Sequence, residues 1–118
     1  MASIAGILER LAPSIESEVR SRLQGFLGGI LRGYLPQTWV FRTEQETASL
    51  VVERDGKVAV VPAAAPSPDV TIEVGHERLA AALTTRSREG LPPGPMTVTP
   101  HTAKGRTAFD YLRGRLGL

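Results

Sequence analysis

Few side chains in this sequence are suited to chemistry. The 118 residues include two histidines, His76 and His101, and no cysteine, which excludes thiol nucleophiles, thiolate metal sites and disulfides. The histidines do not stand at a metal-ligand spacing, and no His-Glu-x-x-His helix, Gly-x-Ser-x-Gly elbow or phosphate-binding glycine loop occurs. A nucleophile, a base and a group that orients the base are therefore not found together. The sequence predicts a protein that is not an enzyme, with no catalytic residue, no metal site and no cofactor.

The distribution of charge only weakly indicates a partner. The net charge is +2 and the pI about 9.5, and most of the excess lies in Lys104, Arg106, Arg113 and Arg115, opposed there by Asp110. A solvated helix face is the favoured interpretation, ahead of a patch that contacts the phosphates of lipid head groups. Nucleic acid is the least favoured partner, because aromatic residues are few and are not interleaved with the basic ones. We predict no nucleic acid partner and keep peripheral membrane contact open.

The stretch from Pro68 to Leu83 is the segment around which we expect the rest of the chain to be organised. Apolar and polar residues alternate in its first part, which predicts a strand with one buried face; the apolar positions are Val70, Ile72 and Val74. After Gly75 the period changes, and Leu79 and Leu83 lie four residues apart, as on the inner side of a short helix. Such a helix can fold back over the apolar face of its own strand. We therefore expect a wall and a lid that enclose an apolar interior.

A long apolar stripe precedes this segment. From Ile4 to Leu35 apolar residues recur at steps of three and four, which predicts helix. Pro13 interrupts the stripe, so we expect a short helix that ends near Leu11 and a longer one with Pro13 in its first turn. Glycines weaken the longer helix by roughly 1 kcal/mol each, so something outside must hold it or its end must bend. These glycines are Gly25, Gly28, Gly29 and Gly33.

Three uses of the stripe remain open. Packing against a sheet is favoured, followed by an interface with a second subunit or a partner helix, for which Phe26 and Ile30 are the candidate contacts. A membrane-surface helix is the third, since arginines occupy the polar side but share it with glutamates. Residues 1–35 thus form either part of the same domain or an interaction arm, and residues 36–118 form the main domain.

The remaining elements alternate strands and helices. Pro36 ends the helical region, and strand-like runs follow at 37–43, 47–54 and 57–61, the last two joined by Asp55-Gly56, which is a strong hairpin signal. A short strand at 96–99 closes on Pro100, which suggests an edge position. Thr102 can cap a helix that runs to about Leu116. The order predicts an α+β fold with helices over one face of a sheet.

The sequence also bears on location. Residues 1–11 lack a basic region and carry Glu9 within their apolar run, unlike a secretory signal. No segment approaches the roughly 18 uninterrupted apolar residues of a membrane span. We expect a cytoplasmic protein.

The order of elements, with Pro-Asp-Val-Thr-Ile-Glu-Val at 68–74 and Leu-Ala-Ala-Ala-Leu-Thr at 79–84, resembles the sterol carrier protein type 2 family. The resemblance covers about residues 37–116 and includes Gly-Pro-Met-Thr-Val at 94–98 and a closing helix at 108–116. It implies a five-stranded mixed sheet with helices on one face and a hydrophobic tunnel for a sterol, a fatty acyl chain or another lipid. It assigns the tunnel wall to eight residues, all of which are equally good core residues: Ile72, Val74, Leu79, Leu83, Met96, Val98, Phe109 and Leu112.

The chain departs from the family pattern at two places. Family members often have lysine and glycine around the last strand, where this chain has Thr97, Thr99 and Pro100, so the tunnel mouth is expected to differ. The residues 116–118, Leu-Gly-Leu, are not a Ser-Lys-Leu peroxisomal address. The long apolar stripe is similar to that of relatives that act as accessory proteins in isoprenoid quinone synthesis.

Two hypotheses follow. The first is a lipid carrier without catalytic activity, which holds a sterol, fatty acyl or isoprenoid-like molecule in the tunnel. The alternative is a scaffold module of the same fold with a filled core, which associates through the N-terminal helix as a homodimer or with a partner enzyme, as an accessory factor in isoprenoid quinone synthesis would. The space between the sheet and the helix at Leu79 to Leu83 separates the two.

Overall fold

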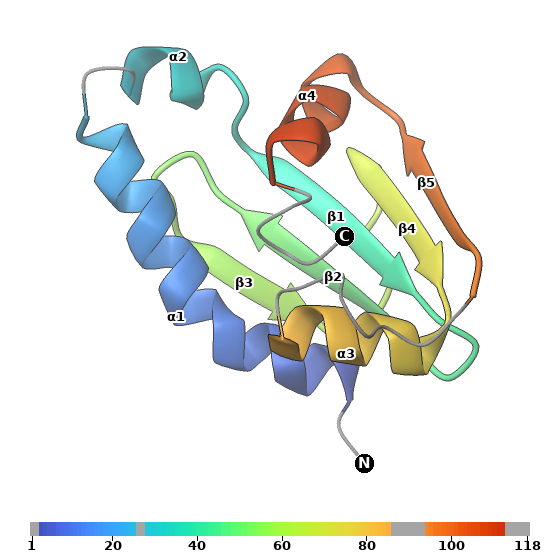
Figure 1. The fold of residues 1–118 in the computed structure, drawn as a ribbon. Helices are drawn as coiled ribbons and strands as arrows, with labels where there is room; N and C mark the ends of the chain where they lie inside the picture. Colours follow the sequence, from blue (N-terminus) through green and yellow to red (C-terminus); the bar gives the residue numbers. More distant parts are fainter. Residues whose placement is uncertain (1–2, 26–27, 86–93, 113–118) are drawn as a thin grey trace.

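In a computed structural model of the protein, the described residues form four helices and five strands (Figure 1). The structure describes residues 3–25, 28–85 and 94–112, with the side chains of residues 111 and 112 excepted. The elements in chain order are α1 (Ile4–Leu23), α2 (Gly28–Arg32), β1 (Gln37–Arg42), β2 (Thr47–Val52), β3 (Val58–Val61), β4 (Val70–Val74), α3 (His76–Thr85), β5 (Met96–Pro100) and α4 (Ala103–Leu112).

The strands form one mixed sheet in the order β3-β2-β1-β4-β5. β1, β2 and β3 form an antiparallel meander, and β2 and β3 are joined by the predicted Asp55-Gly56 turn, where Gly56 has φ of +91°. A positive φ of this size costs little only for glycine. β4 pairs in parallel with β1, while β5 pairs with β4 in antiparallel register. The predicted five-stranded mixed sheet and hairpin are confirmed, and β5 lies at an edge, as Pro100 suggested.

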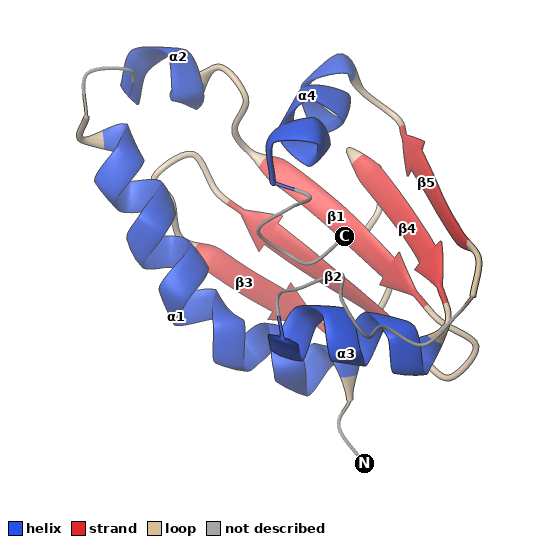
Figure 2. Cartoon of the chain, in the orientation of Figure 1, coloured by secondary structure: helices blue, strands red, loops and turns tan. Residues whose placement is uncertain are grey.

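Helices α1, α3 and α4 lie on the same side of the sheet, and α2 lies beside α1 beyond the end of the sheet (Figure 2). α1 runs along the β3 and β2 side, α3 crosses one end of the sheet, and α4 covers β1 and β4 at the other end (Figure 1). The predicted α+β architecture with helices on one face is therefore confirmed. Between the two layers lie the most deeply buried large side chains, which include Phe41, Ile72, Ile4 and Leu8.

The alternation in β4 follows the prediction. Val70, Ile72 and Val74 face the helices and are buried, while Glu73 is exposed on the opposite face. Part of that opposite face is also covered. The hydroxyl of Ser49 donates to the carbonyl of Ala63 at 2.6 Å and accepts from the N–H of Ala65 at 2.8 Å, so the segment after β3 lies against β2 there.

The N-terminal helical segment differs from the expectation in two ways: it does not break near Leu11, and it ends earlier than predicted. α1 is one continuous helix from Ile4 to Leu23 with Pro13 inside it, and it does not break near Leu11. Pro13 is exposed, so the break in hydrogen bonding that proline imposes falls on the solvent side of a helix whose other side is packed. Both ends of this helix are anchored by buried residues, Ile4 and Leu8 at one end and Leu23 at the other.

The longer helix expected to reach Leu35 instead ends at Leu23. A second, short helix, α2, begins at Gly28. A Cβ on Gly28 would lie only 2.0 Å from the carbonyl oxygen of Leu23, so only glycine permits this close approach. Of the two expected outcomes, a helix held from outside or a helix that does not continue straight to its end, the second agrees with the end of α1 at Leu23.

One contact ties α1 to the β3 edge of the sheet. Glu16 of α1 accepts a hydrogen bond from the N–H of Val58 at 2.9 Å and lies 3.4 Å from Arg20, one turn further along the helix. The glutamate thus satisfies a backbone group at the first residue of an edge strand.

Candidate functional site

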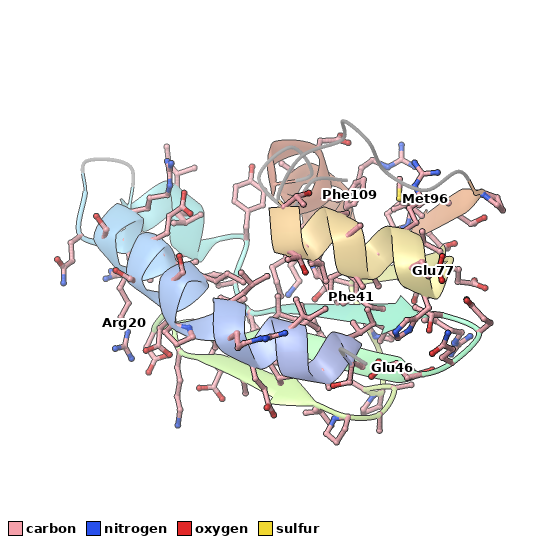
Figure 3. The ribbon with its side chains drawn as sticks, turned by 60° about the horizontal axis from the view of Figure 1, so that its bottom comes forward. Arg20, Phe41, Glu46, Glu77, Met96 and Phe109 are labelled. Atoms are coloured by element: carbon pink, nitrogen blue, oxygen red, sulfur yellow. The ribbon has the colours of Figure 1, made fainter. Side chains whose placement is uncertain are left out.

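The centre of the predicted site is formed by β4 and α3. Ile72 points from β4 toward the helices, and Leu79 and Leu83 point from α3 toward the sheet. In Figure 3 Phe41 lies on the sheet between α1 and α3. The spacing of four residues places both leucines on the same side of α3, and the strand places Ile72 opposite them. The expected wall and lid are therefore brought together.

The centre of this apolar cluster is closely packed. Ile72, Leu79 and Leu83 have 0% of their surface exposed. In the described structure no space that admits a water molecule therefore adjoins these three side chains. An apolar ligand can contact them only if the side chains packed around them move apart.

The rim of the cluster lies on β5. Met96 pairs with Val74, and Val98 pairs with Ile72, so both β5 side chains extend the same apolar face toward the edge of the sheet. Val74 is buried, whereas Met96 and Val98 are only partly buried. Apolar surface therefore continues from the buried centre to a border that solvent reaches. Figure 3 shows Met96 and Phe109 on the side of α3 that faces away from α1.

α4 contributes an aromatic contact at the other end of the face. Phe109 is 6% exposed and lies against Trp39 of β1, with ring centroids 5.7 Å apart and a tilt of 48°, a geometry that aromatic pairs prefer. Of the eight predicted wall residues, seven belong to or pack against a single apolar cluster. The eighth, Leu112, has a side chain outside the described residues. Their role as ligand contacts stays a prediction.

A polar network around the buried Asp69 fixes α4, and it was not predicted from the sequence. The Asp69 carboxylate accepts from the N–H of Thr38 at 2.9 Å and from the hydroxyl of Thr102 at 2.8 Å, and it lies 3.6 Å from the Lys104 ammonium. Thr102 also caps α4, as predicted, by accepting from the N–H of Gly105 at 3.0 Å. The signal that could have revealed the network is the acid directly before a buried strand, which needs partners when it is itself buried.

A second polar contact orients Trp39. The Gln37 amide donates to the carbonyls of Tyr34 at 2.6 Å and Lys104 at 3.1 Å, and its oxygen accepts from the Trp39 indole N–H at 3.0 Å. Gln37 is 5% exposed, so its polar groups need these protein partners. Together the two networks position the aromatic end of the apolar face without placing a charged group inside it.

The histidines lie outside the apolar face. The Nδ1 atom of His76 lies 3.1 Å from the Thr43 hydroxyl, and the Nε2 atom of His101 lies 2.8 Å from the Thr71 hydroxyl. Within residues 3–25, 28–85 and 94–112, no group of three or more His, Asp or Glu side chains could hold a metal ion. Both histidines have contacts that fit a structural role.

Of the two residues predicted to mediate association, the structure describes one. Ile30 on α2 is 63% exposed, while Phe26 lies outside the described residues. Most of the remaining stripe is used internally, since Ile4, Ile7 and Leu8 belong to the main apolar cluster. A second subunit, a partner enzyme and a membrane surface stay predictions. No helix in the described part of the chain is both long and apolar enough to cross a membrane.

An open surface hollow of about 460 Å³ lies on the solvent side of α1. It is lined by Ser14, Ser17, Glu18, Ser21 and Arg22. Its lining is polar and it lies on the outer surface of a helix, so it does not have the character of a lipid site. The apolar face beneath α3 remains the better candidate.

Comparison with solved structures adds to this description. The crystal structure of sterol carrier protein 2 like 2 (SCP2-L2) from Aedes aegypti matches 93% of this chain and 99% of its own, with a TM-score of 0.51 and 18% sequence identity. The chain has the sterol carrier protein 2 fold. The predicted resemblance is thus confirmed at the level of the fold.

A structure described as a UbiJ-SCP2 ubiquinone synthesis protein is also similar. It matches 89% of this chain and 96% of its own, with 18% identity and a TM-score of 0.45. No family model and no curated protein matches the sequence.

Proposed function

We propose that the protein binds a lipid between β4, β5 and α3 and carries it without catalysing a reaction. The observation that supports this proposal is the apolar face that continues from the fully buried Ile72, Leu79 and Leu83 to the partly buried Met96 and Val98. A rim of this kind gives an apolar chain a place to make its first contacts before it reaches the centre. The sterol carrier protein 2 fold is in keeping with such a role.

The ligand class follows from the lining. The seven described wall residues are aliphatic, aromatic or thioether side chains, so the ligand is a sterol, a fatty acyl chain or an isoprenoid-like chain. Each methylene group taken from water contributes about 0.8 kcal/mol. Eight buried methylenes would therefore contribute about 6 kcal/mol, from which the cost of moving the packed side chains apart must be subtracted.

The test uses a fluorescent fatty acid and one pair of variants. We expect Val98→Glu to weaken binding at least tenfold, because it places a charge on the apolar rim of β5. Thr99→Glu is the matched control, since Thr99 is exposed and its side chain points to the opposite face of the same strand. Native mass spectrometry of the protein should recover a bound lipid. If no lipid is recovered and no fatty acid binds, the proposal is wrong.

A second candidate function is that of a scaffold module with a filled core that associates through α2. The close packing around Ile72, Leu79 and Leu83 and the exposed Ile30 are the observations that favour it. A large aliphatic side chain that is 63% exposed is a candidate contact for a second copy of the chain. Sedimentation at micromolar concentration should then detect a dimer that Ile30→Lys dissociates. Ser21→Lys on the exposed side of α1 is the control and should leave the dimer intact. A monomer at all concentrations would exclude this candidate.

A further inference from the structure

One four-residue turn holds the N-termini of two helices. The turn Thr43–Glu46 joins β1 to β2, and it carries two carboxylates that are two residues apart. Glu46 accepts hydrogen bonds from the first N–H groups of α1, those of Ile4 and Ala5, the latter at 3.3 Å. Glu44 accepts from the first N–H of α3, that of His76, at 3.0 and 3.2 Å. Figure 3 shows Glu46 at this end of α1.

The two helices depend on the turn to different degrees. α1 has a cap of its own, because the Ser3 hydroxyl accepts from the N–H of Gly6 at 2.9 Å. α3 is preceded by Gly75, which has no side chain that could accept such a bond. Its first N–H is instead satisfied by Glu44, a residue 32 positions away in the sequence. A negative charge there also complements the helix dipole, so α3 relies on the turn more than α1 does.

The turn is held in shape by contacts of its own. The Thr43 hydroxyl accepts from the N–H groups of Gln45 at 3.1 Å and Glu46 at 3.0 Å. The same hydroxyl lies 3.1 Å from Nδ1 of His76, and that nitrogen lies 3.9 Å from the Glu46 carboxylate. His76 is 7% exposed, so the first residue of α3 is packed against the turn as well as bonded to it.

We propose that α3 is a lid over the apolar face and that the turn Thr43–Glu46 is the clasp that keeps it closed. Leu79 and Leu83 have no exposed surface and Ile72 lies beneath them, so movement of α3 away from the sheet would uncover all three side chains. Glu44 carries the contact that opposes this movement. The ligand that enters is that of the proposed function, on which this part of the inference rests, whereas the opening of α3 is measured without any ligand.

The test compares Glu44→Ala and Glu44→Gln with Glu53→Ala in the full chain. Glu53 is exposed and lies in the turn after β2, so it controls for the loss of a carboxylate elsewhere. Hydrogen exchange of the α3 amides should become on the order of tenfold faster in Glu44→Ala. It should rise less in Glu44→Gln, which keeps an oxygen acceptor and most of the shape. The amides of β1, β2 and β4 should exchange as in the unmodified protein.

The lid inference is overturned if exchange of α3 is unchanged, or if the strands accelerate as much as α3 does. Glu44→Gln keeps the test decisive should Glu44→Ala fail to fold. A second measurement is the association rate of the fluorescent fatty acid, which should rise in step with α3 exchange. Faster exchange without any fatty acid binding would support the clasp at Glu44 and refute the proposed function. Binding by the unmodified protein with no change in either rate on substitution would support the function and refute the lid.

Discussion

At the scale of single residues, the apolar face depends on a few polar side chains that are not part of it. Asp69 joins the end of the loop before β4 to both β1 and the start of α4 through Thr38, Thr102 and Lys104. Gly105 lets α4 approach this point closely, since a Cβ there would lie 2.4 Å from the Asp69 carbonyl oxygen. The position of Phe109 follows from these contacts.

Gly105→Ala is expected to destabilise the protein by about 1–3 kcal/mol, because the added methyl group meets backbone atoms that cannot rotate away. Urea unfolding measures the change. Gly29→Ala is the matched control, as a Cβ there meets nothing within 4 Å and alanine favours helix. Equal stability of the Gly105→Ala variant and the unmodified protein would show that α4 does not pack against Asp69 as described.

Asp69→Asn is expected to cost about 1–3 kcal/mol, since the buried amide loses the ion pair with Lys104 and must turn a donor toward groups that also donate. The exposed Asp110 of α4 provides the control, because Asp110→Asn should change the free energy of unfolding by less than about 0.5 kcal/mol. Thermal unfolding of both variants checks the difference. A neutral effect at Asp69 would mean that the network does not hold α4.

At the scale of elements, local patterns predicted the hairpin at Asp55-Gly56, the strand of Val70 to Val74, the helix after Gly75 and the edge position of Met96 to Pro100. Each of these depends on residues close together in the sequence. The parallel pairing of β4 with β1 could not be predicted, because it joins residues some thirty positions apart, as in the pair Trp39 and Val70. The capping of α3 by Glu44 could not be predicted for the same reason, since the two residues that form it are 32 positions apart.

In the candidate site, too, some features could be predicted from the sequence and others could not. The inward direction of Ile72, Leu79 and Leu83 follows from periods of two and four residues, and the structure confirms their burial. How completely these side chains fill the space between them was not predictable. Packing depends on which side chains of α1 and β1 meet them, and the sequence predicts a helix break near Leu11 that α1 does not have.

Pro13→Ala provides a test of the continuous α1. We expect it to raise the free energy of unfolding by about 1–3 kcal/mol, because alanine restores a backbone donor in the middle of the helix and removes the steric conflict of the proline ring. Ser14→Ala on the exposed side of the same helix should gain no more than about 0.5 kcal/mol. If Pro13→Ala instead lowers the stability, the proline starts a separate helix.

At the scale of the whole molecule, residues 3–25 and the strands share one interior. Ile4 and Leu8 of α1 are as deeply buried as Phe41 of β1 and Leu79 of α3, with 0% of their surface exposed. The helix that begins the described structure is therefore integrated with the sheet through its side chains. The candidate site shares this interior, since Ile72 belongs to the same apolar cluster.

A chain that begins at Pro36 is expected to lose its cooperative fold. Ile4, Ile7 and Leu8 each contribute about 1.5–3 kcal/mol by burial, and their sum is comparable to the whole stability of a typical domain. Near-UV circular dichroism and urea titration measure the loss. Adding residues 1–35 as a separate peptide should restore the signal. A truncated chain that unfolds cooperatively by itself would identify residues 1–35 as an independent arm.

At each border of the sheet, one hydrogen-bonding position is not available to a strand from a neighbouring molecule. At the β3 border the Glu16 carboxylate already occupies the N–H of Val58, and at the β5 border Pro100 has no N–H to offer. A strand from another copy would find these hydrogen-bonding positions taken or absent. The protein should consequently resist sheet-to-sheet polymerisation when it is concentrated. Glu16 would then oppose fibre formation in addition to holding α1 against β3.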